Sequence, residues 1–516
     1  MKHTILILFS ALLLAACDDF FDVNPDSSLD VKIDSEEKIA ELLTAAYPRA
    51  SYYTFLEPRT DNVGERVKGE HNRLNEAMFF WEDYDQEDLD TPLNYWNACY
   101  KGIAQANTAL ELLASYEKTA RVKALYGEAF LLRAYLHFML VNIWSEPYGT
   151  NKSDMALGIP YLTKPEKHAL VEYQRGTVKE VYDKIEADLK LGITLVDDRF
   201  YEYPKFHFNK KAAYAFASRF YLMKGEWNNV IEYADYVLGS NPKKLLRTWY
   251  KFVNDAHLRS NFTKLYNDVN EPSNLMFTTT ESRITRNLPT EKYGSSMDYT
   301  KKWFDKKLIE GCSKSPNNLS HVLPFTRTGG AVVNGWYLAK CDEMDLSDGS
   351  GGVRPRNLFV TNVLFSVEEV MLNRIEAYAM THAYDKAVDG IIDYIQTKYN
   401  VSLSCPRSAY TWTNSENYQL YTPFYGMTLK QLALVKTITE IRQREFLHEG
   451  LRWFDIRRFY LPVKRSSKSP WYRPLEKADE RKQLQIPAEA INRGLKPNPR
   501  SFDVSGLPVD PYRPRN

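Results

Sequence analysis

Aromatic side chains are the residues of this sequence that are best suited to hold a ligand. Tyr, Phe and Trp number 35, 25 and 10, together 14% of the 516 residues, which is more than a helical core of this size usually needs. Tyr and Trp tolerate a half-wet environment, and their rings can stack on the faces of sugars or peptides. We expect ligand-binding rings outside the periodic helical segments, in loops laid over a rigid body. The candidates are Tyr52, Tyr53, Trp81, Tyr293, Tyr299, Trp303, Trp336 and Tyr337, with Asn62 and Arg73 as polar partners.

The sequence patterns that would indicate catalysis are weaker than those that indicate ligand binding. The sequence contains no G-x-S-x-G and no H-E-x-x-H motif, so neither a nucleophile elbow nor a zinc-protease helix is indicated. A glycoside hydrolase needs two carboxylates about 5–10 Å apart. Among 66 acidic residues some pair would meet that distance by chance. We therefore predict no enzyme and no catalytic residue, and keep a surface glycoside hydrolase as the enzymatic alternative.

Metal and disulfide chemistry is not indicated either. Apart from Cys17, the cysteines form no C-x-x-C pair and have no histidine cluster nearby, which argues against a zinc site. A fold of this size does not need disulfides, so we expect no obligatory one, and whether Cys312 and Cys341 pair is left open. The acidic segment 342–348 lacks the spacing of an EF-hand and is interpreted as a solvated turn, and whether it binds a structural calcium is left open. We predict no metal ligands and no cofactor. The residues concerned are Cys99, Cys312, Cys341 and Cys405, and Asp342, Glu343, Asp345 and Asp348.

The charge balance excludes one class of partner. Lys and Arg number 67 and Asp and Glu 66, which gives a net charge of +1. A chain this close to neutrality has no overall field that would attract nucleic acid or a strongly charged substrate. We therefore predict no nucleic-acid partner and expect ligand recognition to be local.

The N-terminus has the features of an export signal. Lys2 and His3 precede an apolar run from Ile5 to Leu14, which is too short to span a bilayer and has the length of a secretory signal. The run ends in Ala15, Ala16 and Cys17, which resembles a lipobox. We predict a signal peptide over 1–16, lipidation of Cys17 and a tether over 17–34. Several acyl chains on one residue suffice for stable membrane anchoring.

Helical periodicity dominates the rest of the chain. Apolar residues recur at three- and four-residue steps, and large aromatics alternate with Ala and Gly as they do in paired, closely packed helices. We predict a mainly α fold in which tetratricopeptide-like helical hairpins form a right-handed superhelical scaffold, with an irregular, loop-rich region for the ligand. One domain is expected over 35–516, with repeats at about 90–240 and 365–460 and the irregular part at about 240–365.

A family resemblance rests on motifs at both ends of the chain. Glu449-Gly450, Arg452-Trp453, Asp455-Ile456 and Arg458-Phe459 resemble the SusD/RagB signature. Ile441 stands where that family usually has Glu. The signature is expected to be structural, with Arg452, Asp455 and Arg458 satisfying one another on one helical side and Trp453 packing beneath. The earlier segments that resemble the family are Trp96, Tyr100, Ile103 and Asn107, Glu128-Ala129, and Gly158-Ile159-Pro160.

The resemblance implies a non-catalytic lipoprotein of the cell outer membrane that faces the exterior. Proteins of this kind close over a SusC-like TonB-dependent transporter and hold an oligosaccharide for import, so we expect a glycan ligand. Two alternatives stay open besides the glycoside hydrolase. The same architecture could capture peptides, or the repeats could form a protein-binding scaffold.

Overall fold

The computed structural model describes residues 33–149, 154–166, 173–249, 259–309, 312, 315, 325–328, 334–345, 358–403, 420–465, 467–470 and 472–500. The predicted signal peptide 1–16, the lipidation site Cys17 and all but the last two residues of the tether lie outside these ranges, as do Asp348 and Cys405.

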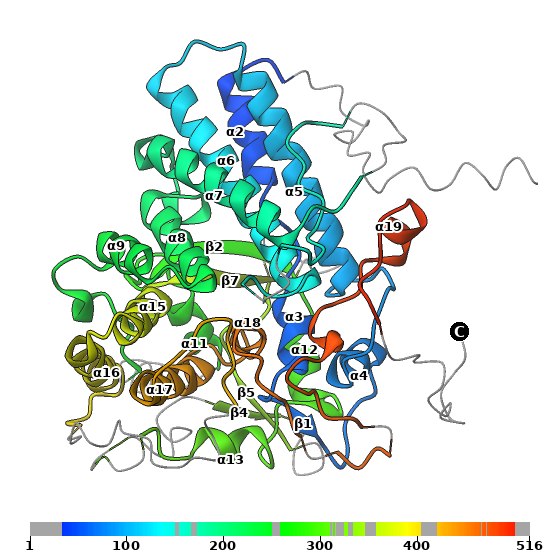
Figure 1. The fold of residues 1–516 in the computed structure, drawn as a ribbon, viewed down its shortest axis with the longest axis vertical. Coiled ribbons are helices and arrows are strands. Elements are labelled where there is room, and N and C mark those ends of the chain that lie inside the picture. Colours follow the sequence, from blue (N-terminus) through cyan, green and yellow to red (C-terminus); the bar gives the residue numbers. More distant parts are fainter. Residues whose placement is uncertain are drawn as a thin grey trace, which may run out of the picture.

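Four helices form the upper part of the molecule in Figure 1. Helices α5, α6 and α7 begin at threonines, Thr91, Thr119 and Thr177, whose side chains accept a hydrogen bond from the backbone N–H three residues later. Such caps satisfy amide groups that have no partner inside the helix. Helix α6 is long and apolar enough to cross a membrane, but 89% of its most apolar 18-residue stretch is buried inside the protein, so it is a core helix. These helices are α2 (Glu36–Ala45), α5 (Pro92–Leu113), α6 (Ala120–Trp144) and α7 (Val178–Leu195).

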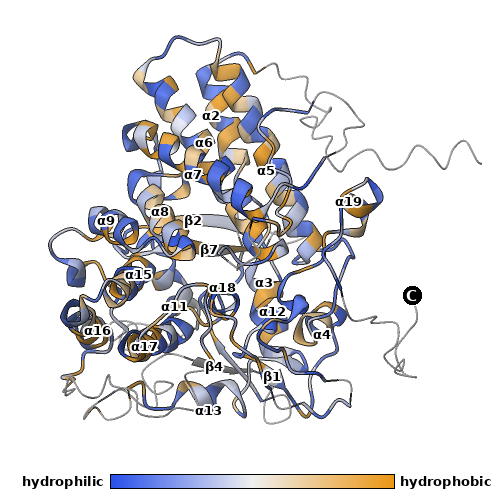
Figure 2. Cartoon of the chain, viewed as in Figure 1, coloured by the Kyte–Doolittle hydropathy of each residue, from blue (hydrophilic) through white to orange (hydrophobic). Residues whose placement is uncertain are grey.

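Further antiparallel helix pairs continue from this group. Gly225 joins α8 to α9 in the left-handed conformation, with φ of 70°, which glycine adopts without a steric penalty. Hydrophobic and hydrophilic residues alternate along α2, α5 and α9 in Figure 2, and buried and exposed residues alternate along the same helices. The prediction of a mainly helical, tetratricopeptide-like fold is confirmed. The helices are α8 (Lys210–Lys224), α9 (Trp227–Leu238), α15 (Val367–Met380), α16 (Tyr384–Tyr399), α17 (Leu429–Glu445) and α18 (Leu451–Arg458).

The region predicted to be irregular holds short strands and short helices. Strand β2 (Asn274–Glu281) pairs antiparallel with β7 (Leu358–Ser366), and this pair lies between the upper and lower helices in Figure 1. Strand β6 pairs with the other side of β7, β1 pairs with β3, and β4 pairs with β5. The remaining strands are β1 (Gly64–Glu65), β3 (Tyr293–Gly294), β4 (Phe325–Thr328), β5 (Gly335–Leu338) and β6 (Met344–Asp345).

Short helices connect these strands to the helical scaffold. Most have fewer than two turns, so their position depends on tertiary contacts rather than on helix propensity. The α-helices are α3 (Tyr53–Leu56), α4 (Arg73–Phe79), α11 (Arg259–Tyr266), α12 (Ile284–Thr290), α13 (Thr300–Phe304) and α19 (Ala488–Asn492). The 3-10 helices are η2 (Glu57–Arg59), η3 (Asp198–Phe200), η4 (Pro204–Phe206), η5 (Pro242–Lys244) and η9 (Glu480–Lys482).

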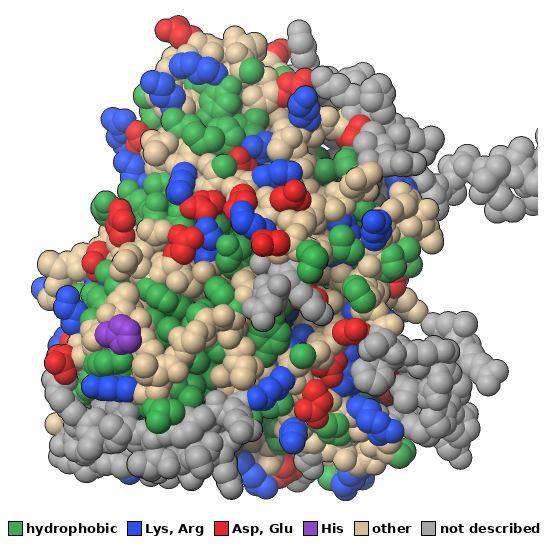
Figure 3. Space-filling model, viewed as in Figure 1, with side chains coloured by type: hydrophobic (Ala, Val, Ile, Leu, Met, Phe, Trp, Pro, Cys, Tyr) green, Lys and Arg blue, Asp and Glu red, His purple; other side chains and the backbone are tan. Residues whose placement is uncertain are grey.

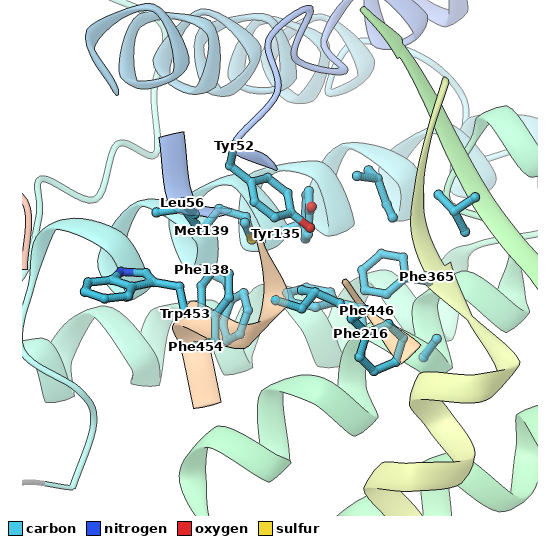
Figure 4. Packing of buried hydrophobic residues seen from close by; sticks show 14 of the residues in the cluster. Tyr52, Leu56, Tyr135, Phe138, Met139, Phe216, Phe365, Phe446, Trp453 and Phe454 are labelled. Carbon is cyan, nitrogen blue, oxygen red and sulfur yellow. The ribbon is translucent and has the colours of Figure 1, made fainter. Parts of the chain in front are cut away.

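One hydrophobic core joins distant parts of the chain. Tyr135 on α6 lies edge-on to Phe216 on α8, with ring centroids 5.5 Å apart, and to Phe365 on β7, at 5.6 Å. Figure 4 shows these rings together with Tyr52 and Trp453, which come from the two ends of the chain. The core therefore fixes the N-terminal, middle and C-terminal segments relative to one another.

The C-terminal signature forms a buried ion network, as its spacing predicts, with one difference. Asp455 accepts hydrogen bonds from Arg442 Nε at 3.0 Å and from Arg458 Nε at 2.8 Å. Arg452 instead forms a two-pronged pair with Asp61, with both distances 2.8 Å. The partner of Arg452 is therefore Asp61, almost 400 positions earlier in the chain, and not the expected neighbour Asp455 on the same helix. Trp453 is fully buried beneath them.

The cysteine prediction needs correction. Cys312 is disulfide-bonded, whereas Cys99 and Cys341 are buried free thiols. Cys312 and Cys341 therefore do not pair, and the protein contains a disulfide that the sequence did not lead us to expect. Among the described residues, no group of three or more His, Cys, Asp or Glu side chains could hold a metal ion.

Candidate functional site

A polar cavity of about 390 Å³ is lined by residues of β1, β3 and α4 and of the segment 468–470; β1 and α4 lie at the lower right of Figure 1. Ligand pockets commonly have volumes of about 300–1,000 Å³, so this space could hold a small ligand or one end of a longer one. Its lining comes from three stretches of chain, within 65–82, at 292–293 and at 468–470. We call it the α4 cavity.

Helix α4 forms the first wall. Asn72 caps the helix by accepting a hydrogen bond from Asn75 N–H. Arg73, at the first turn, reaches both Glu76, at 3.3 Å, and Glu82, at 2.9 Å. Both carboxylates line the cavity. The single guanidinium group holds them in place and leaves further oxygen lone pairs for a ligand.

Strands β1 and β3 form the second wall. Glu65 and Tyr293 lie directly opposite one another in the ladder, and Lys292 Nζ is 3.3 Å from Glu65 Oε1. Behind them, the buried Arg66 donates to the carbonyl oxygens of Pro289, at 2.7 Å, and Leu288, at 2.8 Å, and also to that of Ser295. Burial lowers the pKa of Arg66 to about 10. These bonds fix the turn that carries Lys292 and Tyr293.

The third wall is the segment 467–470. Ser467 Oγ donates to Glu65 Oε2 at 2.6 Å, and Lys468 N–H donates to the same oxygen at 2.7 Å. Burial alone would raise the pKa of Glu65, but these hydrogen bonds and Lys292 outweigh it and hold the pKa below its ordinary value. Glu65 is therefore ionised at neutral pH and joins the second wall to the third.

Two aromatic rings line the cavity between the charged groups. Phe80, at the end of α4, is half-buried and lies edge-on to Tyr293, with centroids 5.3 Å apart. Tyr293 also packs on Phe79, at 4.6 Å. Figure 3 shows basic and acidic side chains mixed across the face of the molecule. The α4 cavity has the same mixed character, with ring surface beside paired charges.

Six of the sequence candidates are buried away from the α4 cavity, so the structure does not bring them to it as ligand contacts. A ring or amide without exposed surface offers nothing to a ligand. Tyr53 OH, for example, donates to Val363 O at 2.8 Å inside the core, and Tyr337 stacks on His448 at 4.9 Å. The buried candidates outside the cavity are Tyr52, Tyr53, Trp81, Trp336, Tyr337 and Asn62.

The other four candidates retain some accessible surface or lie at the cavity. Tyr293 is 5% exposed and turns that surface to the α4 cavity. Arg73 is exposed beside the cavity and holds two of its carboxylates. Tyr299 is half-buried against β1, and burial raises its pKa to about 12. Trp303 on α13 is half-buried, with Arg444 5.8 Å from its ring. The structure thus brings only Tyr293 and Arg73 together at the cavity.

Sequence reasoning missed most of the residues that line the cavity. Phe80 was not among the aromatic candidates, and Glu65, Glu76, Glu82 and Lys468 are single charges without a motif. The capping residue Asn72 could have indicated the start of a short helix. Nothing in the sequence, however, links Lys468 to Glu65, which lies about 400 residues earlier in the chain. Only the fold brings the two together.

The cavity chemistry favours binding over proton transfer. Glu76 and Glu82 share Arg73, and Glu65 is paired with Lys292. A general acid for glycoside hydrolysis needs a carboxyl with a raised pKa, whereas the pKa of Glu65 is lowered. Held carboxylates and an exposed lysine are instead suited to hydrogen bonding with hydroxyl groups.

The arrangement of helical hairpins and short sheets is that of a helical-repeat protein. Residues 19–222 match the model of a SusD-like family that is described as starch-binding and associating with the outer membrane. These residues are thus SusD-like, and the resemblance predicted from the motifs of the chain is confirmed. No curated protein matches the chain.

Solved structures share this fold over nearly the whole chain. A SusD superfamily protein from Bacteroides thetaiotaomicron has 18% identity and a TM-score of 0.67, covering 90% of this chain and 100% of its own. A SusD-like carbohydrate binding protein from Bacteroides vulgatus has 17% identity and a TM-score of 0.64, with coverages of 89% and 96%. A SusD superfamily protein from Parabacteroides distasonis has 18% identity and a TM-score of 0.60, with coverages of 90% and 99%.

Proposed function

We propose that this protein is a non-catalytic lipoprotein of the outer membrane that binds oligosaccharides in the α4 cavity and delivers them to a SusC-like TonB-dependent transporter. The observation that carries the proposal is the cavity itself, in which the rings of Phe80 and Tyr293 lie among carboxylates that already have cationic partners. The family description as starch-binding supports the ligand class.

The physical match to a sugar has two parts. Sugar rings present an apolar face that packs on an aromatic ring, with contacts of about 0.5–1.5 kcal/mol each. Their hydroxyl groups both donate and accept hydrogen bonds, and the cavity offers held acceptors at Glu65 and Glu82 and a donor at Lys468. Several modest contacts give an affinity that still permits release of the ligand to a transporter.

Features of the N-terminus support membrane attachment and an outward-facing orientation. Lipidation at Cys17 would anchor the chain, and the acidic residues Asp18 and Asp19 resemble surface-export signals of lipoproteins. The family description as associating with the outer membrane supports this location. The transporter partner rests on the family resemblance.

Calorimetric titration of the purified protein with a panel of neutral and acidic oligosaccharides and of peptides tests the proposal. We expect binding of an oligosaccharide that is weakened by Phe80→Ala. The matched control is Tyr236→Ala, which removes an exposed ring on α9, with 57% of its surface accessible, away from the cavity. Binding of peptides alone would favour peptide capture, and turnover of a glycan would favour the glycoside hydrolase.

A further inference from the structure

We propose that Trp81 and Arg465 are positioning residues whose stacked side chains hold two walls of the α4 cavity in a fixed relation and so set its affinity for an oligosaccharide. The inference rests on the proposed function, because those walls are the walls of the proposed binding site. Neither side chain needs to touch the ligand.

Trp81 occupies a backbone position that usually selects glycine. Its φ is 58°, and it follows the end of α4, where Glu82 N–H donates to Ala77 O at 2.8 Å and Trp81 N–H donates to Met78 O at 3.3 Å. This is the Schellman pattern, in which the left-handed residue is commonly glycine. A bulky residue in this conformation is strained and persists only where its surroundings hold it. The turn alone would be better served by glycine, so the reason for tryptophan lies in its side chain.

The indole of Trp81 is held by a hydrogen bond and by two guanidinium groups. Its Nε1–H donates to Arg59 O at 2.9 Å. The guanidinium carbon of Arg465 lies 4.1 Å from a ring centroid of Trp81, and that of Arg481 lies 5.5 Å away. Guanidinium groups stack on aromatic faces through cation–π attraction, which is stronger when both partners are buried. Trp81 and Arg465 are both buried.

Arg465 extends the same contact to the rest of α4 and to the chain before it. It donates from Nη1 to Pro58 O and from Nη2 to Phe79 O, both at 2.8 Å. Its guanidinium carbon also lies 4.0 Å from the ring centroid of Phe79. Arg465 therefore contacts the last turn of α4 through both the backbone and the side chain of Phe79.

Both residues continue directly into walls of the cavity. Phe80 and Glu82, on either side of Trp81, line the α4 cavity. Two residues after Arg465, Ser467 donates to Glu65, which lines the cavity as well. A shift of the Trp81–Arg465 stack would thus move Phe80 and Glu82 relative to Glu65. Contacts that depend on two walls at once would weaken together.

The first experiment removes the indole without disturbing the turn. Trp81→Gly places at this position the residue that its backbone conformation favours, and we expect its affinity for the oligosaccharide to fall tenfold or more. Hydrogen exchange of amides within 72–82 should speed up in the same variant. Trp249→Phe is the matched control, because Trp249 is a buried tryptophan with Lys398 Nζ 4.4 Å from its ring centroid, outside the cavity lining. It should leave both readouts unchanged.

The second experiment measures the coupling of the two side chains. Arg465→Lys keeps the charge but loses the planar stack and the two-pronged donation, and it should weaken binding to a similar extent even if Trp81→Gly fails to fold. In a double-mutant cycle the two losses of affinity should be far from additive. Affinity at the wild-type level in a folded Trp81→Gly, or additive losses, would overturn the inference. If the wild-type protein binds no oligosaccharide, the proposed function fails, and hydrogen exchange within 72–82 still decides whether the stack holds the wall.

Discussion

Asp455 is buried between two guanidinium groups, and its replacement by Asn tests how far the signature network stabilises the fold. The side chain is 1% exposed and accepts from Arg442 at 3.0 Å and Arg458 at 2.8 Å. Arg458 also pairs with Glu376, at 2.8 Å, whereas the other side-chain partner of Arg442 within the described part of the chain is the neutral Asn373. Loss of the Asp455 charge leaves Arg442 without an anion, which for a buried pair costs about 3–5 kcal/mol.

Urea denaturation followed by circular dichroism measures this cost against a surface control. Lys179 and Asp183 form an ion pair of 2.7 Å with both side chains about half exposed, so Asp183→Asn should cost no more than about 0.5 kcal/mol. If Asp455→Asn lowers the free energy of unfolding as little as Asp183→Asn does, the network is not a stabilising element of the fold.

The pH dependence of the same variant has a definite sign. Burial alone would raise the pKa of Asp455, but the charges of Arg442 and Arg458 outweigh it and hold the pKa below its ordinary value of 3.8. The stabilisation is therefore present above pH 3.8 and is lost as the pH falls through the lower folded value. The difference between wild type and Asp455→Asn should shrink in acid. A difference that grows in acid would contradict the assignment.

Two other changes have expected outcomes. Gly225→Ala should lower the free energy of unfolding by about 1–2 kcal/mol, because a Cβ is disfavoured in the left-handed conformation between α8 and α9, and thermal denaturation would show it; no change would indicate that the turn relaxes. Cys17→Ser should move the protein from the outer-membrane fraction to a soluble or inner-membrane fraction on cell fractionation, and outer-membrane retention of the variant would argue against the lipid anchor.

The scaffold could be predicted from the sequence because helix periodicity is local information. Stripes such as Trp96, Tyr100 and Ile103 lie on one face of a single helix, and all three are buried as the spacing indicates. The signature around Arg452 was placed on a helix for the same reason. Its true partner, Asp61, was not predictable, because nothing in the spacing of the C-terminal residues refers to residue 61.

The binding site was harder to predict, because exposure depends on contacts between distant segments. Trp81 lies outside the helical repeats and looked like a ligand platform, yet Arg465 and Arg481 cover its ring. Tyr53 is buried because its hydroxyl reaches β7, about 300 residues away. Conversely, Phe80 reaches the cavity because α4 ends in the unusual turn at Trp81. For an aromatic residue outside a periodic stripe, the sequence therefore does not decide whether the ring is exposed or buried. That depends on the fold.

The most direct test of the account is the ratio of the oligosaccharide dissociation constants of Phe80→Ala and of the wild type, measured by calorimetry. If the ring of Phe80 stacks on the sugar, the loss of about 0.5–1.5 kcal/mol corresponds to a ratio of about 2 to 13. Tyr236→Ala should give a ratio close to one. Equal dissociation constants for Phe80→Ala and wild type would contradict the placement of the glycan in the α4 cavity.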